Sequence, residues 1–192
     1  MYIPQDNKHR CDWCLKDELY VQYHDLEWGT PVYDDTVLFE FLILESFQAG
    51  LSWHTILKKR ENFRRAFASF DATTVAAYGE KEIDLLMQDK GIIRNRLKIE
   101  AAINNARCFL EIQRQYGTFS NYIWSFTDGK IIRNFPVNLL ELPATSPHSD
   151  AMSKDMTKKG FKFRGSKICY AFMQAIGMVD DHLVGCWKKS YD

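Results

Sequence analysis

The sequence predicts an all-α protein, and three observations lead to that class. Helix start and stop signals bracket most of the apolar segments. Strands do not alternate with helices in a repeating order, which argues against a doubly wound α/β fold. The strand-like stretch at residues 130–134 is short and lies between an Asp-Gly turn and Pro136. At 192 residues, the chain is long enough for one well-buried domain or for two small lobes that share a cleft.

Acidic residues begin the first two predicted helices. Asp34 or Asp35 opens an apolar helix over residues 37–47, and Gly50 ends it. Asp71 caps a short helix that runs through the sequence VAAY.

Helical signals continue through the middle of the chain. Residues 80–87 form one segment, and residues 95–116 form a long amphipathic helix that Gly117 ends. Residues 120–126 add one or two further turns. We therefore expect a helical core over residues 34–142.

The following segment predicts a helix, a hairpin and a second helix over residues 149–177. Ser149 or Ser153 caps the first helix, and Gly160 is a suitable stop. Ser166 caps the second helix. The proline-containing stretch LPATSPHS, which leads into this unit, is a candidate linker between two lobes.

Composition narrows the class of protein. The chain is 46% hydrophobic and 26% charged, as in globular proteins, and it has no apolar run long enough for a membrane span. Five cysteines are too few, and odd in number, for a disulfide framework, and the first residues lack a secretory apolar core. We expect a soluble protein in a reducing cytoplasm, with a monomer as the default state and no membrane partner.

Positive charge is concentrated in the predicted hairpin, although the whole chain has a formal net charge of zero. Residues 153–167 carry six lysines or arginines against Asp155 alone. Such a run is usually a solvated face. Here, however, backbone N–H groups at Gly165 and Ser166 would lie at a helix N-terminus, which favours phosphate and therefore DNA. The basic residues that we expect at DNA phosphates are Lys162, Arg164 and Lys167.

Residues near the two ends of the chain supply a candidate metal site. Cys11, His24, His182 and Cys186 offer two thiolates and two imidazoles, which is the ligand set of a closed tetrahedral zinc site. On a helix, His182 and Cys186 would share one face, while Cys11 and His24 would come from a looser segment. The alternative is two buried thiols and two ordinary histidines. A metal would clamp residues 1–33 to residues 178–192.

Several sequence blocks, in order along the chain, resemble the DNA-3-methyladenine glycosylase I family. This resemblance implies an all-α helix-hairpin-helix DNA glycosylase fold, with two helical lobes around a base-binding cleft. It also implies a structural zinc held by the four cysteines and histidines above. The blocks are RCDW (10–13), YHDLEWG (23–29), LESFQAGLSWHTILKKRENFR (44–64), GIIRNRLKI (91–99), KKGFKFRGSKICYAFMQAIG (158–177) and DHLVGCW (181–187).

The resemblance assigns roles in binding a flipped base. It places Glu45 and Tyr23 at the adenine edge and stacks Trp53 on the ring. Aromatic residues also cluster in this part of the chain, and together they could form a cage suited to a cationic alkylated purine. Such aromatics can also be core residues, as we expect for Trp28. The cluster is Trp13, Tyr20, Tyr23, Trp28 and Trp53.

Glu45 lies in an otherwise apolar segment, where burying a carboxylate is costly unless it is paired or hydrogen-bonded. A structural ion pair with an Arg or Lys is the alternative to a role in base binding. We assign Glu45 the catalytic role of stabilising charge on the base.

The resemblance also implies that Gly50 and Leu51 enter the gap left by the extruded nucleotide. The expected reaction is hydrolysis of the N-glycosidic bond of 3-methyladenine in double-stranded DNA, without strand cleavage, because no lysine stands out as a nucleophile. The family is understood to lack the catalytic aspartate of its superfamily. We expect Asp180 and Asp181 to cap the turn that presents His182; a catalytic role for either is the alternative.

Two departures and two other functional classes complete the sequence predictions. Cys14 forms a CxxC with Cys11, and His54 follows the pocket tryptophan, where an aliphatic residue would be natural. A catalytically silent DNA-binding module could retain the hairpin and the zinc clamp, but it would not need Glu45. A metalloenzyme would need an open coordination position, which four protein ligands do not leave.

Overall fold

The computed structural model describes residues 2–191 and confirms the all-α class. Helices dominate, and two very short strands pair with each other. The α-helices are α1 Glu18–Leu26, α2 Asp35–Gln48, α3 Trp53–Leu57, α4 Arg60–Ala66, α5 Ala72–Ala76, α6 Glu80–Gln88, α7 Arg96–Tyr116, α8 Phe119–Trp124, α9 Pro147–Lys158 and α10 Ser166–Ala175. The short 3-10 helices are η1 Asp12–Cys14, η2 Ala68–Phe70, η3 Ser125–Thr127 and η4 Leu139–Glu141, and the strands are β1 Ile132–Arg133 and β2 Val179–Asp180.

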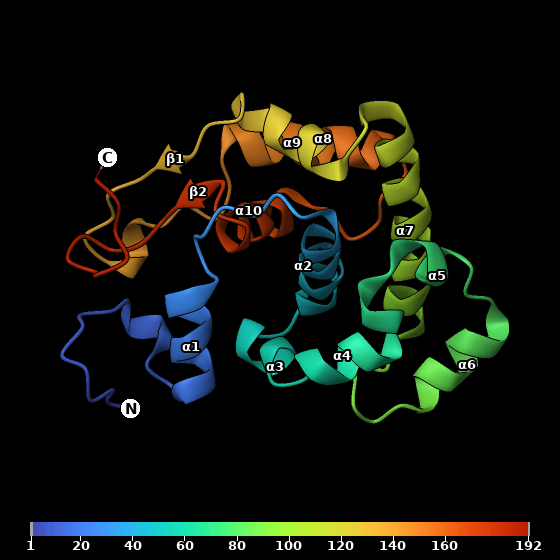
Figure 1. Cartoon of the computed structure of the whole chain (residues 1–192), viewed down its shortest axis with the longest axis horizontal. Helices are drawn as coiled ribbons and strands as arrows, with labels where there is room; N and C mark the ends of the chain where they lie inside the picture. The colour runs from blue at the N-terminus through green and yellow to red at the C-terminus, as the bar shows by residue number, and fades with distance from the viewer. Residues whose placement is uncertain (1, 192) are drawn as a thin grey trace.

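Helix α2 is the central element of the fold (Figure 1). It packs against α3, α7, α8 and α10, and every residue from 38 to 47 is buried. A helix that is covered on all sides needs apolar residues all round instead of a single stripe, which explains the sequence VLFEFLIL. The fold therefore holds Glu45 inside the protein.

Three predicted helix starts are confirmed by their side-chain caps. Asp34 accepts a hydrogen bond from Val37 N (3.0 Å), and Asp71 accepts one from Thr74 N (2.6 Å). Asn95 accepts one from Lys98 N (3.1 Å). Each cap satisfies one of the free N–H groups in the first turn.

The helix-hairpin-helix unit is present as α9 and α10, with both starts shifted. Helix α9 begins earlier than predicted, because Ser146 and Ser149 form a reciprocal capping box ahead of Pro147. Helix α10 begins with Ser166, so this serine is its first residue and not its cap. Its hydroxyl instead hydrogen-bonds Ser149 (2.8 Å) and ties the two helices together.

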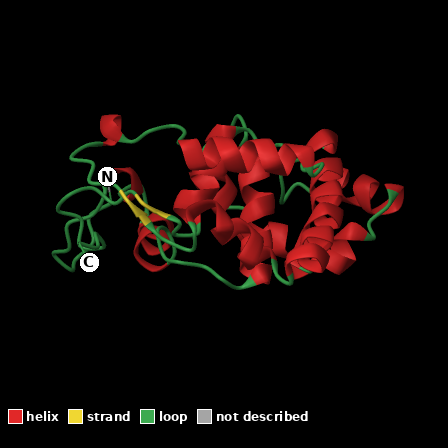
Figure 2. Cartoon of the chain, turned by 90° about the horizontal axis from the view of Figure 1, so that it is seen from above, coloured by secondary structure: helices red, strands yellow, loops and turns green. Residues whose placement is uncertain are grey.

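The segments near both ends of the chain lie on one side of the molecule (Figures 1 and 2). Trp187 N donates to the carbonyl of His9 (2.9 Å). The predicted strand at residues 130–134 is confirmed as β1, and it pairs in parallel with β2 from the C-terminal region. These contacts bring the sequence-distant cysteines and histidines to one place.

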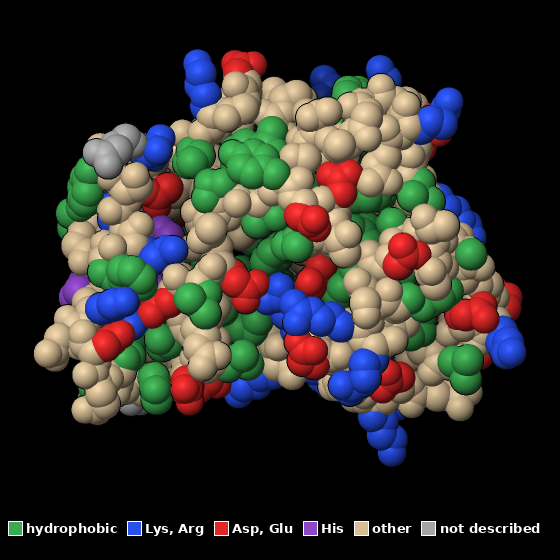
Figure 3. Space-filling model, in the orientation of Figure 1, with side chains coloured by type: hydrophobic (Ala, Val, Ile, Leu, Met, Phe, Trp, Pro, Cys, Tyr) green, Lys and Arg blue, Asp and Glu red, His purple; other side chains and the backbone are tan. Residues whose placement is uncertain are grey.

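Charge on the surface is mixed. On the face seen in Figure 3, Lys and Arg side chains are interspersed with Asp and Glu, in keeping with the net charge of zero. No helix among residues 2–191 is long and apolar enough to cross a bilayer.

Candidate functional site

A cavity of about 200 Å³ lies where α1, α2, α3 and α10 meet. The five residues predicted to hold a base all line it, and they come from four different elements. The lining residues are Trp13, Tyr20, Tyr23, Trp28, Glu45, Gln48, Trp53, Leu142, Ala171 and Gln174.

Glu45 is the acidic residue of this cavity. Its side chain comes from the central helix α2, and the residue is only 3% exposed. Burial raises the pKa of Glu45 to about 8, and the positive charge of Arg164 opposes that rise. Oε2 has no hydrogen-bond partner, and no Lys, Arg or His side chain of residues 2–191 approaches the carboxylate within 4.0 Å. The close structural ion pair considered above is therefore absent from this part of the chain.

Aromatic rings form the cavity walls. Trp13 and Tyr20 pack edge to face with centroids 4.9 Å apart, and the rings of Tyr23 and Trp53 are 5.4 Å apart. Burial holds the pKa of Tyr23 well above its usual range, so its hydroxyl stays protonated and can donate a hydrogen bond. Trp53 Nε1 is buried without a partner. Buried polar atoms nearly always have a hydrogen-bond partner. The unpaired Trp53 Nε1 and Glu45 Oε2 are therefore suited to bind the polar atoms of a ligand.

The mouth of the cavity is the turn after α2. A second hollow, of about 180 Å³, is lined by Glu45 together with Gly50, Leu51 and Lys167. Gly50 has φ +80°, a conformation that favours glycine, and Leu51 is 41% exposed. The predicted wedge residues thus lie beside the entrance.

The hairpin residues differ in exposure. Lys162, Gly165 and Lys167 are exposed, and Ser166 is half-buried, so these four are accessible as expected. Arg164 is only 3% exposed and donates to Leu42 O and Ser46 Oγ on α2. The prediction that Arg164 contacts DNA phosphate is wrong, because its side chain points into the core.

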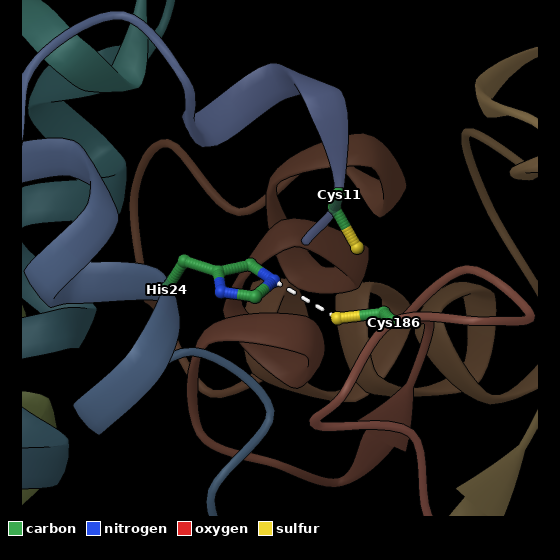
Figure 4. Close-up of side chains that lie close together, drawn as sticks. All are labelled: Cys11, His24 and Cys186. Carbon is green, nitrogen blue, oxygen red and sulfur yellow. Dashed lines mark hydrogen bonds between the residues drawn. The ribbon is translucent and has the colours of Figure 1, made fainter. Parts of the chain in front are cut away.

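Three of the four predicted metal ligands converge (Figure 4). The ligand atoms of Cys11, His24 and Cys186 lie within 4.8 Å of one another, and all three residues are buried. Hydrogen bonds to Cys186 from Cys11 and His24 lower the pKa of Cys186, while the same contact and burial raise the pKa of Cys11, so Cys186 is the thiol that ionises first. The structure thus has a group of side chains able to hold a metal ion.

His182 lies next to this group but outside it. Its ring centroid is 5.1 Å from that of His24, and its Nε2 is buried without a partner. The expected placement on elements is reversed: His24 lies on helix α1, whereas His182 and Cys186 lie in an irregular segment after β2. The close packing of the two ends places these donors without a shared helix face.

Carboxylates orient both histidines. His24 Nδ1 is 2.8 Å from Asp25 Oδ1, and His182 Nδ1 is 2.9 Å from Asp180 Oδ1. With Nδ1 engaged, Nε2 of each ring is available as a ligand, an arrangement typical of metal-binding histidines. Asp25 was missed in the sequence, although it directly follows His24.

The two aspartates near His182 have structural partners. Asp180 accepts from His182 N (3.1 Å), as predicted for a cap, and also pairs with Lys189 (3.1 Å). Asp181 is fully buried and does not cap that turn. Its carboxylate instead accepts hydrogen bonds from Tyr170 Oη (2.8 Å), Gln174 Nε2 (2.7 Å) and Asn134 Nδ2 (2.7 Å).

The two sequence departures also have structural roles. Cys14 Sγ donates to the carbonyl of Cys11 (3.1 Å), behind the metal group. His54 stacks on Tyr20 (4.8 Å) and pairs with Asp17 (2.7 Å), so it supports the outer wall of the cavity. Gln174 was missed as a lining residue, although a polar side chain in the apolar sequence FMQAI is a signal.

Comparisons with known proteins agree with this geometry. Residues 13–189 match the family described as methyladenine glycosylase. DNA-3-methyladenine glycosylase 1 of Escherichia coli (strain K12) is 50% identical over 177 residues, or 92% of this chain and 95% of that protein. The chain belongs to the methyladenine glycosylase family.

Solved structures confirm the fold of the family for this chain. A crystal structure of 3-methyladenine DNA glycosylase I matches with a TM-score of 0.92 at 48% identity, covering 95% of this chain and 100% of that one. A variant of 3-methyladenine DNA glycosylase I in complex with 3-methyladenine matches with a TM-score of 0.91 at 39% identity, covering 94% and 97%.

Proposed function

We propose that the enzyme excises 3-methyladenine from alkylated double-stranded DNA by hydrolysing the N-glycosidic bond, and that it leaves the strand intact. The cavity carries this proposal. Glu45 Oε2 and Trp53 Nε1 are both buried without partners among aromatic walls, and a purine offers polar atoms for both. Family membership supports the same reaction.

The damaged nucleotide must leave the duplex to reach this cavity. Unstacking costs a few kcal/mol, and pocket contacts and a side-chain plug offset it. Leu51, at the mouth, is an apolar residue of the kind that fills such gaps. Exposed Lys162 and Lys167, with the N-terminus of α10 between them, would hold the phosphate backbone.

Bond cleavage relies on the charge of the base. Methylation makes the adenine a cation, so the C1′–N bond breaks with its electron pair moving to the ring, which becomes neutral. Ionised Glu45 attracts the cation, the face of Trp53 stacks on it, and Tyr23 lies with Glu45 at the edge of the ring. Water then adds to C1′ and releases a proton to solvent. Asp181 is fully buried and accepts three hydrogen bonds from protein side chains, so we assign it no part in activating this water.

We further propose that Cys11, His24, His182 and Cys186 hold one structural zinc. Two thiols, two carboxylate-oriented imidazoles and the orphaned Nε2 of His182 fit the donor set of a closed zinc site. Such an ion would join the two ends and take no part in the reaction. Because these ligands require reduced cysteines, we place the enzyme in the cytoplasm, and since the cavity is built by one chain, we propose a monomer.

The experiment is release of free bases from methylated duplex DNA by the purified enzyme and by Glu45→Gln. We expect selective release of 3-methyladenine over 7-methylguanine, with release about tenfold or more slower in the variant, because removal of a charge-stabilising group typically costs a few kcal/mol. No strand cleavage should accompany it.

The outcomes separate the parts of the proposal. Unchanged release by Glu45→Gln would retain the reaction and reject the role of Glu45. No release by the folded, zinc-replete protein would leave a catalytically silent helix-hairpin-helix DNA-binding protein, the alternative that retains the hairpin and the metal site. Cleavage of the strand would contradict hydrolysis alone.

A further inference from the structure

The side chain of Arg164 leaves the DNA-facing hairpin and enters the core beside α2. Its Nη2 donates to Leu42 O and Ser46 Oγ. Its Nε and Nη1 are buried and have no hydrogen-bond partner among residues 2–191. A buried arginine with two unpaired nitrogens is costly, so its position needs an explanation.

Glu45 offers that explanation. It lies between Leu42 and Ser46 on the same helix, is itself 3% exposed, and has an unpaired Oε2. The two opposite charges lie in one water-poor interior, where Coulomb attraction extends beyond hydrogen-bond distance. Each charge therefore offsets part of the desolvation of the other, although no close ion pair is formed.

Other titratable groups near Glu45 do not supply this positive charge. Tyr20 and Tyr23 from α1 are neutral at physiological pH, because burial raises the pKa of both. Cys169 from α10 is likewise neutral, since burial raises its pKa to about 11.

The remaining cations and the histidine near α2 are directed elsewhere. Lys167 is exposed at the mouth, and Lys98 of α7 binds carbonyls at the end of α2. His54 of α3 is paired with Asp17.

Arg60 of α4 is also buried beside α2, but it pairs with Glu40 (2.5 Å) and Glu27 (2.6 Å). In the part of the chain that is described, Arg164 is thus the buried cation that contacts α2 at Leu42 and Ser46, on either side of Glu45.

We propose that Arg164 is a positioning residue that favours the ionised form of Glu45, so that the empty pocket gains the negative charge for a cationic base at a lower pH than burial alone would allow. The inference rests on the proposed role of Glu45 in base binding. It assigns Arg164 to the electrostatics of the pocket, even though the residue belongs to the hairpin.

The test is the pH dependence of kcat/KM for excision from methylated duplex DNA between about pH 6 and 9.5. Neutral substitution, as Arg164→Met or the more polar Arg164→Gln, should move the ascending limb upward by about one pH unit. At pH values below the limb, kcat/KM of the variant should be about tenfold lower than that of the wild type, because the ionised fraction of Glu45 falls about tenfold for each unit by which its pKa rises. At high pH, kcat/KM should return to the wild-type value. Arg164→Lys keeps the charge and should keep the wild-type limb.

A second comparison removes the group through which Arg164 acts. In a Glu45→Gln background, adding Arg164→Gln should leave the pH profile unchanged. Circular dichroism confirms that each variant is folded. A uniform loss at every pH with an unmoved limb would overturn the inference and make Arg164 a packing residue only. If Glu45→Gln alone matched the wild type at every pH, the role of Glu45 would fall, and this inference with it.

Discussion

Glu45 places the requirements of binding and of stability in opposition. Burial raises its pKa from 4.5 in the unfolded chain to about 8 in the folded protein. A carboxyl group with a raised folded-state pKa favours folding fully below the unfolded value, and this contribution is lost as pH rises to about 8. Ionised Glu45 therefore destabilises the protein at the pH at which it would bind a cation.

Glu45→Gln should make the protein more stable, and the gain should grow with pH. The variant carries no charge, so the difference in unfolding free energy should increase from about pH 4.5 to 8, towards an upper limit of about 3 to 5 kcal/mol. Urea denaturation at several pH values measures it.

Glu111→Gln is the matched control for this measurement. Glu111 is at the surface, and its hydrogen bond with Arg114 lowers its pKa to about 2. Removing the Glu111 carboxylate should therefore not increase the free energy of unfolding as the pH rises. A pH-independent effect of Glu45→Gln would contradict a buried, titrating carboxyl group.

The end of helix α2 shows how one element can control the wedge. Lys98 is 7% exposed, and its ammonium donates to Phe47 O (2.8 Å) and Ala49 O (2.6 Å). A cation is favourable at a helix C-terminus, and the Ala49 carbonyl directly precedes Gly50 and Leu51. Helix α7 thereby fixes the turn that we expect to enter the DNA.

Lys98→Met should loosen this turn and leave the pocket itself intact. We expect excision from duplex DNA to fall about tenfold, since hydrogen bonds from charged groups contribute about 1.5 to 3 kcal/mol, while affinity for free 3-methyladenine stays near that of the wild type. Arg107→Met is the control, because Arg107 also lies on α7 and donates to a carbonyl, that of Ala76 (2.9 Å). Equal losses of free-base binding and excision would show a general loss of structure instead.

Element-level prediction worked where a helix carries its own boundary signals. Asp34 and Asp71 begin helices as the sequence indicates, and Asn95 caps the long helix that was expected over residues 95–116. Helix α1 was missed, although Asp17 caps it, because its buried side chains Tyr20, Tyr23 and His24 serve the pocket and the metal group instead of forming an apolar stripe. The sequence of α1 therefore lacks the regular spacing of apolar residues that indicates an amphipathic helix.

At the scale of the whole molecule, the sequence predicted which residues carry unusual chemistry better than it predicted which way a side chain points. Unusual donors identified Cys11, His24 and Cys186 across the length of the chain, since few structures need thiols and imidazoles together. Arg164 was assigned to the surface because charge alone does not show which way a side chain points. Only packing decides that the guanidinium enters the core.

The group of Cys11, His24 and Cys186 lies where the two ends of the chain meet, beside the pocket. His24 follows Tyr23 on α1, and Trp28 lines the cavity while its ring lies 4.6 Å from that of His182. Loss of the metal should therefore disturb the walls of the pocket as well as the ends of the chain.

Cys186→Ser should abolish zinc binding and lower Tm by about 10 °C, since in a protein of this size about 3 kcal/mol corresponds to roughly 6 to 12 °C. Cys108→Ser is the matched control, because Cys108 lies on α7, outside the metal group. Elemental analysis should give about one zinc per chain in the wild type and this control. If the protein purified without metal and Cys186→Ser kept the wild-type Tm and excision rate, the two ends would be held by packing alone, and the clamp would be rejected.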